Sequence, residues 1–498
     1  MNAQSYDNTL DFSFFTLARE HLESMIRHLD SASQQDHGSI EKYIRTEGDE
    51  VLRHLLQGYL DKQAHEETPV QSITGSDGHQ RNHIRQNTSR SVTSLFGSVT
   101  VKRRGYSQRK LSSVFPLDAE LGLNADQYSD GVRRRIVADV IDRSYDRAIH
   151  HHRENCAGLV GKRQAMQLAE DMSQDFETFY KQRATEIELT NDLLVLSFDG
   201  KGLVMQPDGL RDGTRKNAEK SNNKQQTRLS PGQKKDRKRM AQVATVYTIK
   251  PDIRTATSIM DLDKKDDKVA RLRPRLRNKR VWASVEREPE DVIEEAFDEA
   301  LRRDPEQKRQ WVVLVDGHPH QLKLITRTLK QKQVQAVIVM DFIHVLEYLW
   351  KAGHCLHEKG DESVERWVAE RALKVLCGQS DRVARGIRQS ASKRGLTKRE
   401  AIDKCASYLQ KNRSRLCYDK ALSEGFPIAS GVIEGACRHL INDRMDITGA
   451  RWSLQGAEAI LKLRSVYSSG DWEDYWAFHK PCSQARNYDW DVSSDSSQ

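Results

Sequence analysis

LLVLSFDG (193–200) and WVVLVDGH (311–318) are two mostly apolar runs that each end in Asp-Gly. An apolar run of this length, bounded by a turn signal, predicts a strand buried on both faces of a sheet. Further strands are predicted at about 242–249 and 334–340, and helices are predicted between and after them. This alternation of strands and helices predicts an α/β core.

Each of the two runs ends in a carboxylate, Asp199 in the first and Asp316 in the second. Ligands of α/β sheets bind beyond the carboxyl ends of the strands, and two neighbouring carboxylates repel one another unless a cation lies between them. Mg²⁺ prefers such oxygen ligands. With Glu434, which opens a later helix, the acids suffice to hold two Mg²⁺ for phosphoryl transfer. The alternative is that each Asp is a turn residue at a strand end, since Asp-Gly is a strong turn signal.

Composition excludes several classes of protein. The 498 residues include 80 Lys and Arg and 72 Asp and Glu, a formal net charge of +8. No run approaches the roughly 18 apolar residues of a membrane span, and the N-terminus does not resemble a secretory signal. The seven cysteines are scattered and form no CxxC, which favours a reducing cytoplasm. We therefore expect a cytoplasmic protein of several domains with no membrane partner.

The basic residues are concentrated in a loop at about 206–240, which contains eleven Lys and Arg. Such a loop either binds the DNA backbone, with an affinity that falls steeply with salt, or is simply solvated. On the first interpretation we expect it to contact DNA, and the candidate residues are Arg211, Arg215, Lys216, Lys235 and Arg237.

The N-terminal third is expected to be mostly helical, with a polar linker at about 67–90. β-Branched residues around Gly97 predict a hairpin of strands at about 92–95 and 98–103. Three short helices then follow. The first spans about 131–142, the second ends at about 154 and the third begins at about 162. Their lengths and basic flanks suit a helix-turn-helix, although many all-helical linkers have the same pattern.

Four segments carry a resemblance to a known family. They are SFDGKGLVMQPDGLRDGTRK (197–216), VLVDGHPHQLK (313–323), VIVMDFIHVLEYLWKAG (337–353) and the long stretch 431–479 that begins GVIEGACRHLI. These segments resemble transposases of the ISKra-type insertion sequences, a group of DDE transposases allied to the Mutator-like transposases. The resemblance covers about 90–480. It implies an α/β fold with an RNase H-like catalytic core and an all-helical insertion, preceded by a helical N-terminal DNA-binding region that contains a small β-hairpin.

By this resemblance, Asp199, Asp316 and Glu434 are the catalytic acids and metal ligands, with Mg²⁺ or Mn²⁺ as the cofactor. Asp341 and His344 match a D-x-x-H signature, which implies that His344 lies near the catalytic centre. On spacing alone Asp341 is an alternative second ligand, because it also follows an apolar strand. We favour Asp316, because Asp341 belongs with His344 in the signature. We expect the carboxylates of Asp199, Asp316 and Glu434 to converge within a few Å.

The last segment contributes further residues that either face DNA or are structural, namely Arg438, Arg444, Arg451 and Trp452. Arg438 lies four residues after Glu434, on the same face of a helix, where it would orient the carboxylate or hold a phosphate. Trp452 would stack on an unpaired base or pack against the core.

The resemblance implies a DDE-type DNA transposase that binds double-stranded DNA at the ends of an insertion sequence. It would catalyse Mg²⁺-dependent strand cleavage and strand transfer into target DNA, as at least a homodimer, because two ends must be paired. One alternative is an inactive or domesticated DNA-binding protein; the presence of all three acids favours the enzyme. Another is an RNase H-fold nuclease that cuts without joining.

Six regions are expected along the chain. They are a helical N-terminal region (1–90), a hairpin with a helix-turn-helix-like DNA-binding region (91–185), the first part of the core (190–349), the helical insertion (350–425), the C-terminal core helices with Glu434 (426–480) and a tail (481–498).

Overall fold

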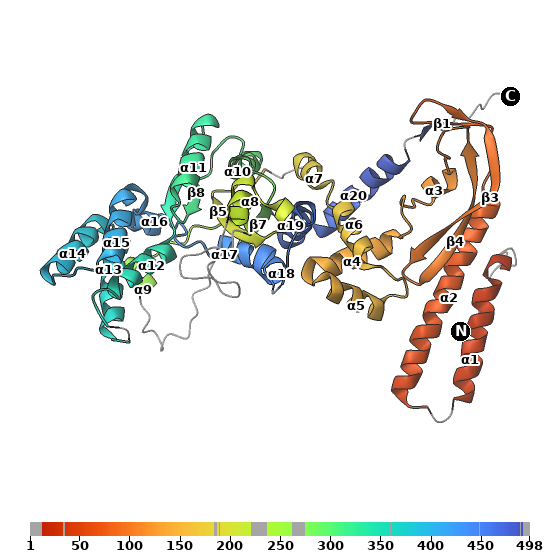
Figure 1. The fold of residues 1–498 in the computed structure, drawn as a ribbon, viewed down its shortest axis with the longest axis horizontal. Helices are drawn as coiled ribbons and strands as arrows, with labels where there is room; N and C mark the ends of the chain where they lie inside the picture. The colour runs from red at the N-terminus through yellow and green to blue at the C-terminus, as the bar shows by residue number, and fades with distance from the viewer. Residues whose placement is uncertain are drawn as a thin grey trace. The chain divides into compact units, whose positions relative to one another are not determined.

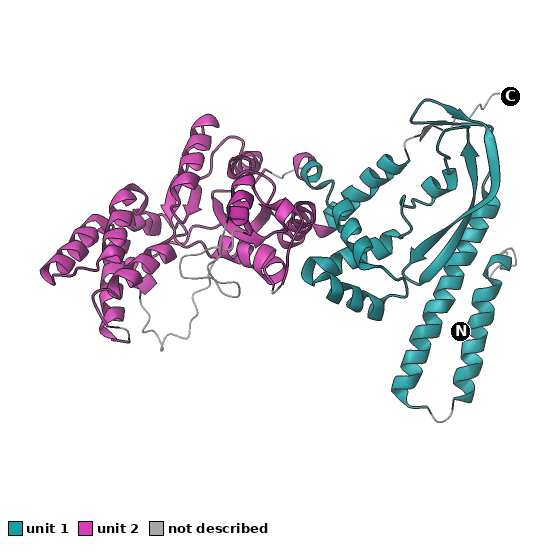
Figure 2. Cartoon of the chain, viewed as in Figure 1, with its two compact units in different colours: residues 1–179, 473–498 teal, residues 180–472 magenta. Residues whose placement is uncertain are grey.

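The computed structural model describes nearly the whole chain, namely residues 12–32, 35–183, 187–188, 190–220, 237–260, 274–358, 360–447, 449–488 and 490–491. The chain divides into two compact units (Figure 2). Unit 1 comprises Met1–Phe179 with Glu473–Gln498, and unit 2 comprises Tyr180–Trp472. No helix in the described ranges is both long and apolar enough to cross a membrane.

Unit 1 begins with two antiparallel helices, α1 (Thr16–Ser31) and α2 (His37–Glu66), followed by a long β-hairpin (Figure 1). The hairpin strands are β3 (His83–Ser94) and β4 (Gly97–Ser107). Leu60 of α2 packs in a buried cluster with valines of both strands. The predicted hairpin is thus confirmed but is longer than expected.

Residues 67–90 are not the irregular linker that the polar sequence suggested. They contain β1 (Ile73–Gly75), β2 (Gln80–Arg81) and the first half of β3. β1 pairs in antiparallel fashion with β2 and with β10 (Trp490–Asp491). The expectation of a loop was wrong here because cross-strand pairing and the burial of Ile73 against Tyr106 hold these short strands, although the segment has no long apolar pattern.

Three short helices of unit 1 pack on one another, α4 (Asp130–Asp142), α5 (Tyr145–Asn155) and α6 (Lys162–Met172). Ser129 and Ser144 cap the first two by accepting hydrogen bonds from backbone N–H groups of the first turn. The predicted helices are confirmed. The remaining helices of this part of the chain are α3 (Pro116–Glu120), α7 (Phe176–Gln182) and α20 (Trp472–Asn487).

Unit 2 is built around a mixed sheet with the strand order β7-β6-β5-β8-β9. β5, β6 and β7 are antiparallel neighbours, whereas β8 and β9 run parallel to β5. β8 is buried throughout, as is the first half of β5, because both consist of apolar residues. The chain is therefore of the α/β class. The strands are β5 (Leu193–Val204), β6 (Lys238–Ile249), β7 (Arg277–Ser284), β8 (Trp311–Val315) and β9 (Val337–Met340).

Strand β7 was not among the strands predicted from the sequence, because it lies in a stretch rich in charged residues. Its edge is covered by α19 (Leu454–Ser469), whose side chains satisfy the backbone of β7 and of the loop after it. Ser469 Oγ accepts a hydrogen bond from Val281 N at 3.0 Å, and Glu458 accepts from Val285 N at 2.9 Å. Because its edge is covered, β7 is not available for pairing with a strand of another chain.

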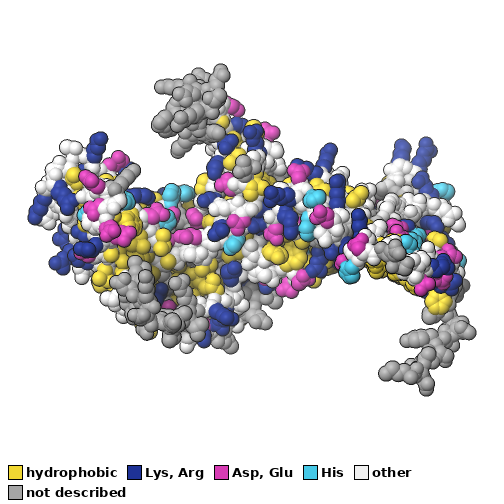
Figure 3. Space-filling view, turned by 90° about the horizontal axis from the view of Figure 1, so that it is seen from below, with side chains coloured by type: hydrophobic (Ala, Val, Ile, Leu, Met, Phe, Trp, Pro, Cys, Tyr) yellow, Lys and Arg dark blue, Asp and Glu magenta, His cyan; other side chains and the backbone are white. Residues whose placement is uncertain are grey.

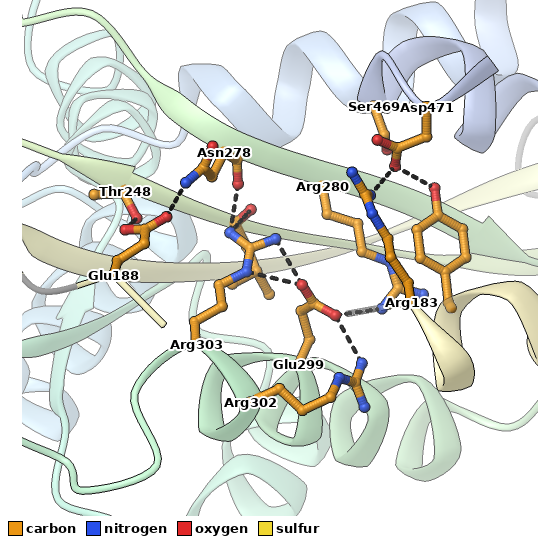
Figure 4. A network of polar contacts seen from close by, with 12 residues as sticks. Arg183, Glu188, Thr248, Asn278, Arg280, Glu299, Arg302, Arg303, Ser469 and Asp471 are labelled. Carbon is orange, nitrogen blue, oxygen red and sulfur yellow. Dashed lines mark hydrogen bonds and ion pairs between the residues drawn. The ribbon is translucent and has the colours of Figure 1, made fainter. Parts of the chain in front are cut away.

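A network of buried charges joins β7 to α10 (Pro289–Arg303), as Figure 4 shows. Glu299 lies at its centre and forms ion pairs with Arg280 at 2.9 Å, with Arg303 and with Arg302. Burial by itself would raise the pKa of Glu299, but the guanidinium groups, that of Arg280 above all, lower it to about 2. Glu299 is therefore ionised and holds the helix to the sheet.

Helices α13 to α16 lie together at one end of unit 2, beyond α12 (Phe342–Gly353) (Figure 1). Each described residue from 350 to 423 is helical or in a turn or bend or without regular structure, so the expected strand-free region is confirmed. The helices are α13 (Ser363–Leu376), α14 (Ser380–Lys393), α15 (Glu400–Lys411), the short η3 (Arg413–Arg415) and α16 (Tyr418–Ser423).

Candidate active site

Asp199 and Asp316 lie at the same level on adjacent parallel strands. Ser197 of β5 pairs with Leu314 of β8, so the two aspartates, each two residues further on, are neighbours across the sheet. Asp199 is not at a strand end, because β5 continues to Val204 and pairs with β6 over its whole length. The interpretation of Asp199 as a turn residue is therefore wrong.

Asp316 does lie at a strand end, followed by a tight turn. Gly317 has φ +93°, a backbone conformation that favours glycine at this turn. Asp316 Oδ1 accepts a hydrogen bond from His318 N at 3.1 Å, and the carboxylate is half-buried. The turn leads into α11 (Pro319–Gln331).

Asp341 is the next acid across the sheet, because Val315 of β8 pairs with Met340 of β9. Its side chain is fully buried and caps α12 by accepting from Ile343 N at 2.8 Å. Its second carboxylate oxygen contacts Ser430 Oγ. Both oxygens of Asp341 thus have a hydrogen-bonding partner inside the protein.

Helix α17 (Gly431–Cys437) packs against β5 and β6 and carries the third expected acid. Glu434 is exposed, and its Oε1 lies 3.2 Å from Ser430 Oγ. One turn later Cys437 Sγ donates to Asp199 Oδ2 at 3.1 Å. Burial, followed by the charge of Asp199, raises the pKa of Cys437, so the group remains a thiol and a donor.

Cys437, at the end of α17, thus contacts Asp199, and Ser430, just before the helix, contacts both Asp341 and Glu434, although neither residue was singled out from the sequence. Cys437 is three residues after Glu434, a spacing that puts both on one helix face and was a usable signal. Ser430 stands directly before the helix, a position that serine often occupies as a cap. No local pattern indicated that its hydroxyl would contact Asp341.

Carboxylates are the kind of ligand that a hard cation such as Mg²⁺ prefers, but these acids do not form a complete set of ligands around one point. Within the described ranges, no group of three or more His, Cys, Asp and Glu side chains is placed to hold a metal ion. The expectation that Asp199, Asp316 and Glu434 converge within a few Å is therefore not met in this structure. Asp316 and Glu434 are nonetheless accessible, and all three offer carboxylate oxygens.

His344 lies on the first turn of α12 and lines the same groove as Asp316. The side chain is 36% exposed, and its Nδ1 lies 4.0 Å from Glu347 Oε2. The structure thus places His344 beside Asp316, whereas Asp199 and Glu434 do not line this groove.

Several of the residues expected to contact DNA are at the surface. Arg211 pairs with Glu288, and Arg215 with Asp212 at 2.6 Å. Arg438 is exposed and lies 3.5 Å from Asp443, not against Glu434. The remaining exposed members are Lys216, Arg237 and Arg451, and Lys235 lies outside the described residues. The expected loop at 206–240 is in part a helix, α8 (Asp212–Lys220).

Arg444 and Trp452 are buried rather than exposed, at 2% and 6%. The guanidinium of Arg444 lies over the Trp452 ring, 4.9 Å from its centre. Trp452 Nε1 donates to Met445 O at 3.0 Å. The expectation that these two residues contact DNA is corrected accordingly: they pack the segment that follows α17 onto the core.

The N-terminal part of the chain matches a known family model. Residues 40–220 match the model of an uncharacterised protein family, UPF0236. The match includes the β-hairpin, α4 to α6 and Asp199, but it ends before Asp316 and Glu434. No curated protein matches the chain.

Proposed function

We propose that this protein is a DDE-type DNA transposase whose acids Asp199, Asp316 and Glu434 act in metal-dependent cleavage and joining of DNA strands. The observation that carries the proposal is the placement of Asp199 and Asp316 at one level of adjacent parallel strands, with Glu434 on a helix that packs on β5. Buried strands that present carboxylates at one edge of a sheet are suited to metal-assisted phosphoryl transfer.

The strand order supports an RNase H-like core, as the resemblance implies. Three antiparallel strands come first in the chain, and the two later ones add in parallel on the other side of β5. The helical region α13 to α16 then separates β9 from α17, which agrees with an insertion before the last acid.

Asp199, Asp316 and Glu434 would hold Mg²⁺ or Mn²⁺, and the bound ions would activate the attacking oxygen and stabilise the leaving one. The ligands would have to come closer together than they are here. Cys437 holds one oxygen of Asp199 in a fixed direction, whereas Asp316 has an accessible carboxylate. The chain itself thus positions one acid firmly and leaves another accessible to a ligand.

Double-stranded DNA, as transposon ends and as target, is the proposed substrate. Lys and Arg side chains are spread over the face seen in Figure 3, with Asp and Glu between them. Exposed Lys216, Arg237 and Arg451 have no carboxylate partner among the described residues and are the first candidates for phosphate contacts. The working form would be at least a dimer, because two ends are joined. All seven cysteines are free, which agrees with a reducing cytoplasm.

The test is an in vitro reaction on DNA that carries this gene with the sequence flanking it on each side. Wild type with Mg²⁺ should release the ends and join them to a target plasmid, and EDTA should stop both steps. Asp199→Asn and Glu434→Gln should abolish both steps without loss of folding. Equal activity of Asp199→Asn and wild type would exclude this site.

A DNA-binding protein without catalysis is the second candidate, favoured by the observation that the acids do not form a closed ligand set. It predicts salt-dependent binding of the flanking DNA with no Mg²⁺-dependent cleavage. Cleavage without joining would instead identify a nuclease of the same fold.

A further inference from the structure

A groove of about 1280 Å³ lies beside Asp316, and neither Asp199 nor Glu434 lines it. Helix α11 forms one wall, α15 and η3 form the other, and α12 contributes His344 and Tyr348. The groove lies wholly within unit 2. It extends from a proposed catalytic acid into the helical region that follows β9.

The groove is strongly basic. Its lining contains five Lys and Arg, and Asp316 is the single acid among the lining residues. Lys323, Arg327 and Lys330 recur at spacings of four and three along the exposed face of α11, which puts them in one row. The opposite wall adds Lys411 and Arg415.

Most of these charges are not neutralised within the protein. Arg327 pairs with Glu290 at 2.7 Å. Over the part of the chain that the structure describes, the other four have no carboxylate partner, namely Lys323, Lys330, Lys411 and Arg415. Unpaired cations on two facing walls create a positive potential that attracts a polyanion.

The row on α11 has a length that fits several phosphates. Seven residues of helix separate Lys323 from Lys330, about 10 Å at 1.5 Å per residue. A duplex strand carries a phosphate for about every 3.4 Å of helix axis, and an unpaired strand is more extended, so the row is long enough to contact about two phosphates. The groove, at about 1280 Å³, is larger than the roughly 300–1000 Å³ of pockets that hold one small ligand, and so has room for a few nucleotides of one strand.

Aromatic rings in the groove favour a nucleic acid over a simple polyanion. Tyr348 and Tyr408 stack with their centroids 4.2 Å apart, and both line the groove. Tyr408 donates to the backbone oxygen of Asp316 at 3.2 Å, which ties the ring pair to the acid. Tyr348 is partly exposed, with Tyr408 against one face of its ring and Lys351 Nζ 5.7 Å from the ring centre, so an unpaired base would stack on the face from which the Lys351 side chain moves aside.

We propose that this groove binds an unpaired nucleic-acid strand, with its backbone along α11 and α15 and a base against Tyr348. That the end of the bound nucleic-acid strand lies at Asp316 rests on the proposed function, whereas the binding of the strand in the groove does not. The helical region thereby becomes part of the DNA-binding surface through Lys411 and Arg415. A duplex end would have to be opened over a few base pairs to enter.

The test measures binding in EDTA, where no cleavage occurs. Fluorescence anisotropy compares a blunt duplex with the same duplex carrying a four-nucleotide single-stranded overhang. Wild type should prefer the overhang DNA by at least fivefold. The double variant Lys323→Glu/Lys330→Glu should weaken overhang binding at least tenfold and remove the preference. The slope of log affinity against log salt should fall by about 1.4, or about 0.7 per lost contact with a single strand.

A matched pair controls for net charge. Lys374→Glu/Lys393→Glu makes the same charge change on exposed positions of α13 and α14 that do not line the groove. This pair should keep the overhang preference. Tyr348→Ala should reduce overhang binding at least fivefold, and Tyr348→Phe should restore it, because only the ring face is needed.

Each result of these binding measurements either supports or overturns the inference. Failure of wild type to bind DNA or to prefer the overhang would overturn the inference, as would an equal loss for both DNAs in the groove variant. Asp199→Asn should retain the preference in full. If the cleavage reaction fails while the overhang preference persists, the groove stands and only the proposed function falls.

Discussion

Asp316 and Asp341 end neighbouring strands at the same level, yet their surroundings differ. Asp341 is fully buried, with one carboxylate oxygen on Ile343 N and the other against Ser430 Oγ. Asp316 is half-buried and faces a basic groove. A fully buried acid is closed to a ligand from the solvent, whereas a half-buried acid is able to take one. This difference favours Asp316 over Asp341 as the second ligand.

The largest expected effect is that of Asp316→Asn on DNA cleavage. A metal ligand stabilises the transition state by several kcal/mol, so we expect Mg²⁺-dependent cleavage to fall at least about 100-fold. The melting temperature should stay close to that of wild type, because the side chain is half-buried and its described hydrogen bond is to His318 N. Cleavage and melting are measured on one preparation. Retained cleavage would remove Asp316 from the site.

Glu299 provides a reference for an acid that is purely structural. Glu299→Gln should lower the free energy of unfolding by about 3 kcal/mol, because a shift of its pKa from 4.5 to about 2 corresponds to that amount and the buried Arg280 loses one of its two carboxylate partners, Glu295 being the other. Since the folded-state pKa is depressed, this stabilisation is present above about pH 4.5 and is lost as the pH falls towards 2.

Urea unfolding at several pH values checks this prediction. Wild type should lose stability between pH 4.5 and 2 more steeply than Glu299→Gln. The exposed Glu306→Gln is the matched control and should change the stability by less than about 0.5 kcal/mol. Equal stability of Glu299→Gln and wild type would contradict the assigned role.

Asp341→Ala tests the other side of the comparison. Loss of the cap on α12 and of the contact with Ser430 should destabilise the protein by about 1–2 kcal/mol. At a temperature where the variant is folded, cleavage should stay within about threefold of wild type. Normal melting together with abolished cleavage would reverse the comparison and make Asp341 the ligand.

Cys437→Ala is expected to have the smallest effect. The thiol orients Asp199, and loss of a group that orients a metal ligand costs about 10-fold or somewhat more in activity. The half-saturating Mg²⁺ concentration should rise, and Cys437→Ser should restore part of the loss because a hydroxyl also donates. A variant with an unchanged Mg²⁺ dependence would show that Cys437 only packs α17.

The identical Asp-Gly pairs show how far a local pattern reaches. At Gly317 the backbone turns with a positive φ, whereas at Gly200 strand β5 continues to Val204. An Asp-Gly dipeptide is compatible with a turn. At Asp199, however, β5 pairs with β6 along its whole length, and this pairing keeps the chain extended. In the same way, the charged residues at the start of β7 did not indicate a strand. Arg280 is buried there because Glu299, which lies on α10, neutralises its charge.

Local patterns in the sequence were enough to predict the α/β class, the buried runs of β5 and β8, the helices α4 to α6 and the helical region after α12. These follow from apolar periodicity and caps, which act over a few residues. The tertiary structure alone decided which acid is capped, that Arg444 and Trp452 are buried, and that Cys437 contacts Asp199 across 238 residues. Such contacts depend on how distant elements pack, and no local pattern contains that information.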